Sequence, residues 1–218
     1  MSDRAARANP FRVSRVLKLR YRLEDTGWQE LLERLQSLGH RGALVGPEGS
    51  GKTTLLEDLE HRLEARGWRI VRLRLNAERR HLTRPEWAAL HRVDSGDLVT
   101  VDGVEQLPWW RWWRLERLCR GAGGLVVTTH RPGRLPCLHE HRTSPELLVD
   151  LVTSLVGRHE AEGLQPELER LFEAHHGNLR DCLRSLYDHW AKGTLASRTV
   201  EPIDEALHAS QHVVAAVL

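Results

Sequence analysis

The sequence predicts a three-layer α/β protein, in which a mostly parallel five-stranded sheet lies between helices and a small helical unit follows. Three observations predict this fold class. Short apolar runs alternate with amphipathic helical patterns over residues 41–143, as in parallel sheets with helical crossovers. A glycine-rich turn joins the first apolar run to the first helix, and residues 144–192 carry helical patterns alone. The 218 residues, 40% of them apolar, suffice for one core and a small appendage.

Four segments follow from these patterns. Residues 1–40 form an N-terminal arm, with an arginine-rich start and an amphipathic helix over 27–40 that is expected to dock on the sheet. Residues 41–143 form the core and residues 144–192 a helical lid. Residues 193–218 are a tail with little periodicity, expected either to be mobile or to dock on a partner.

The first strand, turn and helix occupy residues 41–66, where four leucines of the helix share one face. The turn fits the pattern GxxxxGK[ST] in the strand–loop–helix context that this motif requires. Glycines let successive backbone N–H groups approach phosphates at the helix N-terminus. Lys52 is placed to reach the β- and γ-phosphates, and the Thr53 hydroxyl to ligate Mg²⁺. The turn therefore predicts an ATP-Mg²⁺ site formed by Gly46, Pro47, Glu48, Gly49, Ser50, Gly51, Lys52, Thr53 and Thr54.

Four further strands are expected after this helix. Residues 68–75, WRIVRLRL, alternate apolar residues with arginine, which is typical of an edge strand with one wet face. Residues 98–101 and 125–129 are buried apolar runs, and a short fifth strand falls within 135–141. Crossovers between parallel strands are expected to be right-handed.

A carboxylate closes the strand over 98–101. P-loop enzymes hold hydrated Mg²⁺ with a carboxylate at the end of a neighbouring strand, so Asp102 is predicted to be that residue. The alternative is an aspartate that caps the following helix.

The phosphate-binding turn, Asp102 and the strand ends make residues 41–192 resemble the additional-strand P-loop ATPases, in particular AAA+-like and STAND-like ATPases. The resemblance implies the strand order 5-1-4-3-2, and the N-terminal helix is expected beside the adenine. In much of that group a glutamate directly after the magnesium aspartate polarises the attacking water, whereas Gly103 stands there in this chain. Glu105 is the next carboxylate, and it is either that catalytic group or a charge at a helix start. Slow or partner-dependent hydrolysis therefore stays open.

Two residues match sensor positions of the same group. Thr129, at the tip of the strand over 125–129, is similar to a residue that touches the γ-phosphate or the lytic water, with Thr128 on the opposite face. The alternative is a threonine that suits a strand end. Arg180 resembles a second sensor that would couple the lid to the nucleotide state. Its alternative is a solvated arginine behind an Asn178 cap.

Three helical patterns fill the lid, over residues 145–160, 166–176 and 178–192, separated by glycine and proline signals.

Four of the eight tryptophans interleave with arginines in the helix that follows residue 108, as in nucleic-acid binders. On a helical wheel Trp109, Trp112 and Trp113 share an arc of about 160° with Leu115 and Cys119, which predicts a core-facing or lid-facing surface. Trp110 falls among the arginines. A cation–π contact is the modest interpretation of that position, and a partner surface is the sharper one.

Composition excludes several classes. The net charge of +2 is too weak to argue by itself for a nucleic-acid partner. No apolar run is long enough for a membrane span and the first residues lack the apolar stretch of a secretion signal, so a cytoplasmic protein without membrane contact is expected. The three cysteines fit neither a zinc site nor a disulfide framework and are expected to be reduced, mostly buried thiols.

Three functions compete. The leading hypothesis is an ATPase that acts as a conformational switch on a protein or DNA partner, and a nucleotide-dependent homo-oligomer is compatible with it. One alternative is a P-loop kinase or small-molecule phosphotransferase, for which no acceptor motif is found. Another is a nucleotide-gated binding module with little hydrolysis, which Gly103 favours. A GTPase is disfavoured because neither DxxG after the magnesium aspartate nor NKxD is present.

Overall fold

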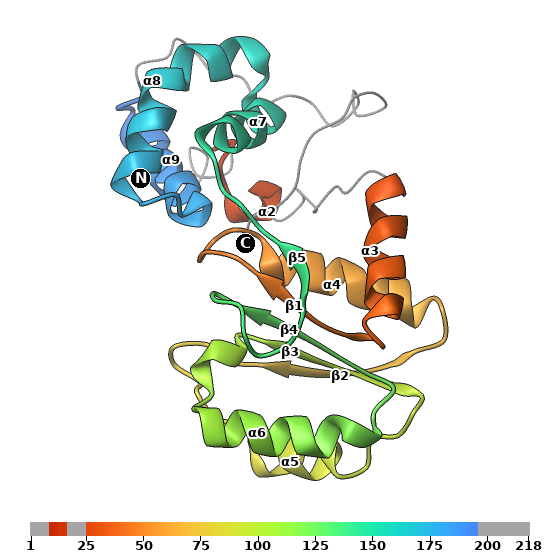
Figure 1. The fold of residues 1–218 in the computed structure, drawn as a ribbon. Coiled ribbons are helices and arrows are strands. Elements are labelled where there is room, and N and C mark those ends of the chain that lie inside the picture. Colours follow the sequence, from red (N-terminus) through yellow and green to blue (C-terminus); the bar gives the residue numbers. More distant parts are fainter. Residues whose placement is uncertain (1–8, 17–24, 196–218) are drawn as a thin grey trace. The chain divides into compact units, whose positions relative to one another are not determined.

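The structure, a computed structural model, describes residues 9–16 and 25–195 (Figure 1). Backbone contacts divide the chain into two compact units. The first unit comprises Glu24–Gly46 and Lys52–His141, and the described residues of the second are 9–16, 47–51 and 142–195. Most of the arginine-rich start predicted for the arm, residues 1–8 and 17–24, and nearly all of the tail lie outside the described residues.

The first unit is built on one sheet of five strands in the order β2-β3-β4-β1-β5. Each neighbouring pair is parallel. This arrangement confirms the predicted α/β class, the five-stranded sheet and the strand order. The strands are β1 (Arg41–Val45), β2 (Arg69–Arg74), β3 (Asp97–Asp102), β4 (Gly124–Thr129) and β5 (Cys137–Glu140).

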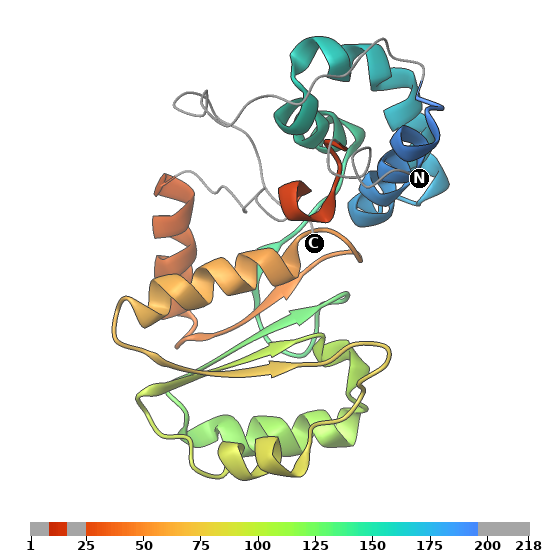
Figure 2. The same cartoon turned by 180° about the vertical axis from the view of Figure 1, so that it is seen from behind.

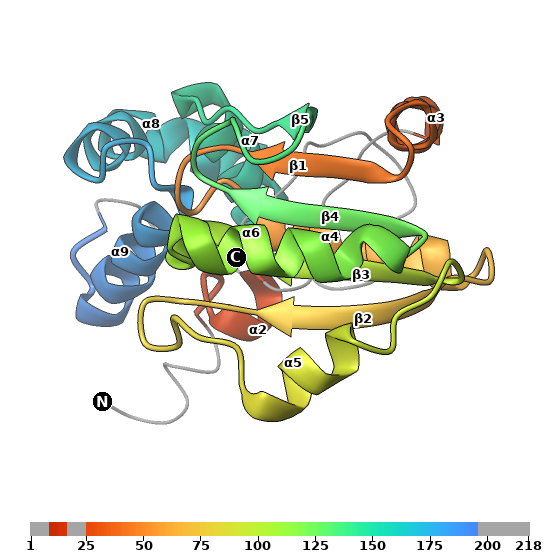
Figure 3. The same cartoon turned by 60° about the horizontal axis from the view of Figure 1, so that its bottom comes forward.

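Helices cover both faces of this sheet, as the three views in Figures 1, 2 and 3 show. One face carries α3 (Asp25–Ser37) and α4 (Lys52–Glu64), and the other carries α5 (Arg84–Leu90) and α6 (Trp109–Leu118). The crossover from β1 to β2 runs in one direction along the sheet and the next two crossovers run back, so right-handed connections put their helices on opposite faces. Two short 3-10 helices, η1 (Val104–Gln106) and η2 (Cys119–Gly121), flank α6.

The core lies between the sheet and α5 and α6 on one side. Central strands contribute fully buried residues such as Val99, Val101 and Val127, which pack with Leu90 and Leu115 of the two helices. Near-continuous apolar strands of this kind are expected where both faces of a parallel sheet are covered.

Strand β2 is an edge strand, as its alternating sequence predicts. Its arginines reach carboxylates of neighbouring elements: Arg72 Nε lies 2.6 Å from Glu60 Oε2 on α4, and Arg69 Nε lies 2.7 Å from Asp97 Oδ1 at the start of β3. These long side chains cover the exposed rim of the sheet, and their charge disfavours pairing with another strand.

The second unit contains α2 (Val13–Val16), α7 (Pro145–Val156), α8 (Arg158–Ala174) and α9 (Leu179–Lys192). The predicted boundaries of the first two lid helices are wrong. The break falls at Gly157, whose φ of +93° favours glycine, and α8 runs through Pro166. Four buried residues, Ala161, Leu164, Leu168 and Leu171, form one continuous stripe along α8. Packing of that stripe outweighs the hydrogen bond that the proline removes.

The predicted burial of the α6 tryptophans is wrong for two of the three. Trp112 is 8% exposed, whereas Trp109 and Trp113 are 76% and 53% exposed. The buried face is formed by Trp112, Leu115 and Cys119, an arc of about 60° at 100° per residue, instead of the wider arc predicted. Trp109 lies about 60° and Trp113 about 100° beyond the Trp112 edge of that arc, so both point to solvent.

Within residues 9–16 and 25–195, no helix combines the length and the apolar character that a membrane crossing requires.

Candidate nucleotide-binding site

The glycine-rich loop connects β1 to α4, as predicted. Gly49 and Gly51 adopt φ values of +71° and +84°, in the left-handed region where a side chain is strained. The first two residues of α4 are Lys52 and Thr53. The loop therefore ends at a helix N-terminus, where partial positive charge and backbone N–H groups favour an anion.

Lys52 is buried, with an exposed fraction of 7%. Its ammonium Nζ donates to the Gly46 carbonyl oxygen at 2.8 Å, which ties the end of the loop to its start. A buried ammonium requires partners because desolvation penalises its charge. The bond holds the cation at the end of β1, next to the residues where the loop begins.

Thr53, Asp102 and Thr128 form a hydroxyl–carboxylate cluster at the carboxyl ends of β3 and β4. The Thr53 hydroxyl lies 3.1 Å from each carboxylate oxygen of Asp102, and the Thr128 hydroxyl donates to Asp102 Oδ1 at 2.7 Å. Arg74 Nε lies 3.5 Å from Asp102 Oδ2 and balances the carboxylate charge. Hydroxyl and carboxylate oxygens are the donors that Mg²⁺ prefers, so the residues present fit that ion.

The residue after Asp102 has little room. Gly103 has φ +77°, and a Cβ built there would lie 2.4 Å from the Leu75 carbonyl oxygen. Its backbone N–H donates to the Thr128 hydroxyl at 2.7 Å. A glutamate at this position would require the end of β2 to move, so the absence of a carboxylate here follows from the local backbone.

Glu105 lies on η1 and pairs with the tip of β4. Its Oε1 is 3.3 Å from His130 Nε2, whereas its Oε2 is buried and has no hydrogen-bond partner among the described residues. Arg134 lies close enough for its charge to interact with Glu105, and donates to the Leu107 carbonyl at 2.7 Å. Burial lowers the pKa of Arg134, and the Glu105 carboxylate partly opposes that effect.

Thr129 and Thr128 differ in what they contact. The Thr129 hydroxyl donates to the Arg131 carbonyl at 3.1 Å, within its own turn, so the structure does not join Thr129 to Asp102. Thr128, which sequence reasoning assigned to the opposite face, makes that contact. The pairing of Val101 with Val127 puts Asp102 next to Thr128, and this register is the signal that a sequence alone lacks.

Within the second unit, the start of α9 lies against residue 49 of the glycine-rich loop. A Cβ on Gly49 would lie 2.0 Å from Asn178 Oδ1 and 3.2 Å from the Arg180 backbone nitrogen. Asn178 is the N-cap of α9, where its side chain accepts from the Asp181 N–H. The N-terminus of α9 therefore contacts the glycine-rich loop. The exposed side chain of Arg180 belongs to the same helix end.

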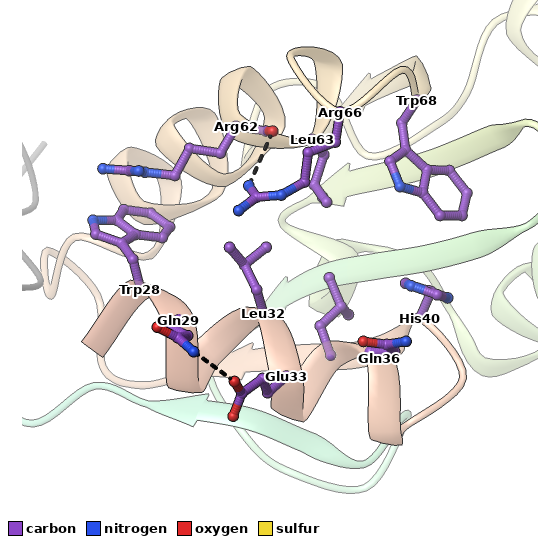
Figure 4. Close-up of a pocket in the computed structure, with 11 residues that line it drawn as sticks. Trp28, Gln29, Leu32, Glu33, Gln36, His40, Arg62, Leu63, Arg66 and Trp68 are labelled. Carbon is purple, nitrogen blue, oxygen red and sulfur yellow. Dashed lines mark hydrogen bonds between the residues drawn. The ribbon is translucent and has the colours of Figure 1, made fainter. Parts of the chain in front are cut away.

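A separate groove of about 520 Å³ lies between α3 and α4 (Figure 4). Arg62 stacks over Trp28 at 4.3 Å, and the rings of His40 and Trp68 are 4.9 Å apart. His40 and Trp68 directly precede β1 and β2, whereas the glycine-rich loop follows β1. The groove is therefore at the other end of the sheet from Asp102 and is not part of the candidate nucleotide site.

A parallel sheet in the order β2-β3-β4-β1-β5, with a GxxxxGK[ST] loop between β1 and α4, defines the fold of a P-loop NTPase. No family model and no curated protein matches the sequence. Two solved structures that match are mutants of Thermotoga maritima RuvB, with 18% and 17% identity and TM-scores of 0.49 and 0.48. Each alignment covers 72% of this chain, and 59% and 58% of the RuvB chains, so this chain matches less than two thirds of their length.

Proposed function

We propose that this protein is an Mg²⁺-dependent ATPase that acts as a nucleotide-driven switch on a protein or nucleic-acid partner. The observation that carries the proposal is the pairing of Thr53 with Asp102, where Thr53 directly follows the buried Lys52 in the chain. This arrangement combines a cation for phosphate oxygens with two oxygen ligands for a metal. The strand order and the loop conformation support it.

Each residue has a proposed role. Lys52 exchanges the Gly46 carbonyl for phosphate oxygens, and loop N–H groups bind the remaining phosphate oxygens. Thr53 and Asp102 would hold Mg²⁺, which neutralises charge on the β- and γ-phosphates when bound. Thr128 orients the Asp102 carboxylate through its 2.7 Å hydrogen bond.

Glu105 is the proposed group that polarises the attacking water. It lies at the carboxyl ends of β3 and β4. Its buried Oε2 accepts no hydrogen bond from the described residues, so it can accept one from a water molecule. The bond to His130 orients the other carboxylate oxygen. Thr129 remains the proposed contact to the γ-phosphate, although its hydroxyl first has to leave the Arg131 carbonyl.

Arg180 is proposed to report the nucleotide state to the helical unit. The N-cap of α9 contacts Gly49 within the second unit, so a ligand on the loop changes the surroundings of this helix end. An effector of this kind works only if it binds two arrangements of the helices with different affinity.

One observation favours a second function, a nucleotide-gated binding module with little hydrolysis. Gly103 leaves no carboxylate next to Asp102, and Glu105 is already paired with His130. In this case ATP would bind without turnover.

Phosphate release from ATP-Mg²⁺ tests the proposal, with Lys52→Ala and Glu105→Gln compared against Glu162→Gln, an exposed carboxylate on α8. We expect Lys52→Ala to abolish both binding and turnover. Glu105→Gln is expected to retain ATP binding and lose at least about 100-fold in turnover. Turnover that survives in Glu105→Gln would contradict the catalytic role of Glu105. Binding without turnover in the wild type would favour the second function.

A further inference from the structure

Helix α6 presents a surface of tryptophan and arginine to solvent. Trp109, Trp110 and Trp113 are 76%, 50% and 53% exposed, although exposed large apolar side chains rarely cluster in this way on a soluble protein. Arg117 lies between these tryptophans on the helix surface, and Arg114 lies next to Trp110. These five residues are called the tryptophan–arginine face below.

The five residues form one continuous arc. At 100° per residue they follow one another around α6 in the order Trp109, Trp113, Arg117, Trp110 and Arg114, an arc of about 140°. Glu116 is the one carboxylate in the sequence of α6, and it falls between this arc and the buried side of the helix. The face therefore consists of indole rings and guanidinium groups alone.

The arginines retain their positive charge toward solvent. Arg117 lies 5.8 Å from the ring centroid of Trp113, and Arg114 lies 4.6 Å from that of Trp87 on α5. In the part of the chain that the structure describes, neither guanidinium forms an ion pair with a carboxylate at 4.0 Å or less. Cation–π stacking orients these groups without neutralising them.

We infer that the tryptophan–arginine face binds single-stranded nucleic acid. Unpaired bases have open π-faces that stack on indole rings, and phosphates pair with guanidinium groups. A duplex hides its base faces, so it would use the arginines and leave the tryptophans in water. An apolar partner surface would leave the charges unpaired. The inference gives the proposed switch a partner. Only the coupling between this partner and ATP rests on the proposed function, because the binding of nucleic acid itself needs no nucleotide.

The chain places this face close to the candidate catalytic segment. Trp109 begins α6 four residues after Glu105, and Pro108 starts the helix as its N-cap. On the buried side of α6, Trp112 lies 5.4 Å from Arg134, whose charge interacts with Glu105. Nucleic acid that shifts the start of α6 therefore acts on the residues around Glu105.

Fluorescence anisotropy of labelled 20-nucleotide single strands, DNA and RNA in separate titrations, tests this inference without ATP. The variants are Trp109→Ala/Trp113→Ala and Arg114→Gln/Arg117→Gln. The control, Arg158→Gln/Arg184→Gln, removes two exposed arginines from α8 and α9. Each tryptophan replaced is expected to weaken binding about fivefold or more. Removing the two arginines is expected to reduce the slope of log K against log salt by about 1.4, and the control is expected to leave both quantities nearly unchanged.

Three binding results would overturn the inference. They are absent binding of both DNA and RNA single strands by the wild type, equal affinity of the tryptophan variant and the control, and tighter binding of duplex than of single strands. If sedimentation shows a wild-type dimer that Trp109→Ala/Trp113→Ala converts to a monomer, the face is an interface between copies instead. Lys52→Ala, titrated in parallel, keeps the two proposals apart, because it should lose ATP and retain the single strand.

Discussion

At the scale of single residues, Gly103 and Thr128 set the geometry around Asp102, the proposed Mg²⁺ ligand. The left-handed φ of Gly103 turns its N–H toward the Thr128 hydroxyl, which in turn donates to Asp102. A larger residue after Asp102 is excluded by the Leu75 carbonyl. A carboxylate side chain at position 103 would therefore require the backbone around Leu75 to move.

Gly103→Ala is expected to lower the free energy of unfolding by about 3 kcal/mol, because left-handed strain adds to a steric clash. Gly67→Ala is the matched control, since Gly67 has φ +92° and nothing within 4 Å of its Cβ position. That variant should cost about 1 kcal/mol from strain alone. Urea unfolding measures both, and equal losses would show that the Leu75 contact is unimportant.

Thr128→Val removes a buried hydroxyl that both donates to Asp102 and accepts from the Gly103 N–H. We expect a loss of about 1–3 kcal/mol in stability, because a buried N–H is left unsatisfied. The apparent Mg²⁺ affinity in the presence of ATP should fall with it. Thr153→Val, at a half-buried threonine of α7 outside the candidate site, is the comparison and should leave the Mg²⁺ affinity unaltered.

At the scale of elements, ion pairs join the edge strand β2 to its neighbours. Asp97 at the start of β3 accepts from Arg69 Nε at 2.7 Å and from the Asp94 N–H at 2.8 Å. The hydrogen bond from Arg69 makes the largest contribution to a lowered pKa of Asp97, and the hydrogen bond from the Asp94 N–H adds to it. The stabilisation is therefore present above the unfolded pKa of about 3.9 and is lost as pH falls through the folded pKa.

Asp97→Asn is expected to destabilise the protein by about 1 kcal/mol at pH 7, a modest value because Arg69 is largely exposed. The difference from wild type should shrink as the pH drops below about 4. Urea unfolding at several pH values from about 3 to about 7 measures this stability difference. Asp188→Asn on α9, an exposed site, serves as control; a gap between wild type and Asp97→Asn that persists at low pH would contradict the account.

Patterns within short segments predicted the elements that depend on local chemistry. The glycine-rich loop and the strand before Asp102 need only neighbouring residues to be recognised. Three features depend on packing between elements and were missed. The contact from Thr128 to Asp102 depends on the register of β3 and β4, the exposure of Trp109 depends on how α6 sits on the sheet, and the course of α8 through Pro166 depends on its buried stripe.

At the scale of the whole molecule, the glycine-rich loop is shared between the two units. Gly46 and Lys52 belong to the first unit, and residues 47–51 belong to the second. If the proposed site is occupied, a ligand on residues 47–51 is expected to stabilise the second unit, and a ligand on Lys52 and Thr53 the first.

The buried thiols report on the two units separately. Burial raises the pKa of Cys119, in the first unit, to about 12 and that of Cys182, in the second, to about 11. Both should resist alkylation at neutral pH until their unit unfolds, whereas the half-buried Cys137 reacts earlier. In moderate urea, ATP-Mg²⁺ should slow labelling of both buried thiols, as mass spectrometry of the peptides would show. Protection of Cys119 alone would restrict the effect of ATP to the first unit.

Calorimetric titration of the wild type and Lys52→Ala with ATP, with and without Mg²⁺, tests the central claim that this loop and Asp102 form an ATP-Mg²⁺ site. The account predicts stoichiometric binding by the wild type that weakens when Mg²⁺ is withheld, and no measurable binding by Lys52→Ala. It also predicts that Asp102→Asn loses the dependence on Mg²⁺. ATP binding of equal affinity in the wild type and Lys52→Ala, or none in the wild type, would contradict the claim.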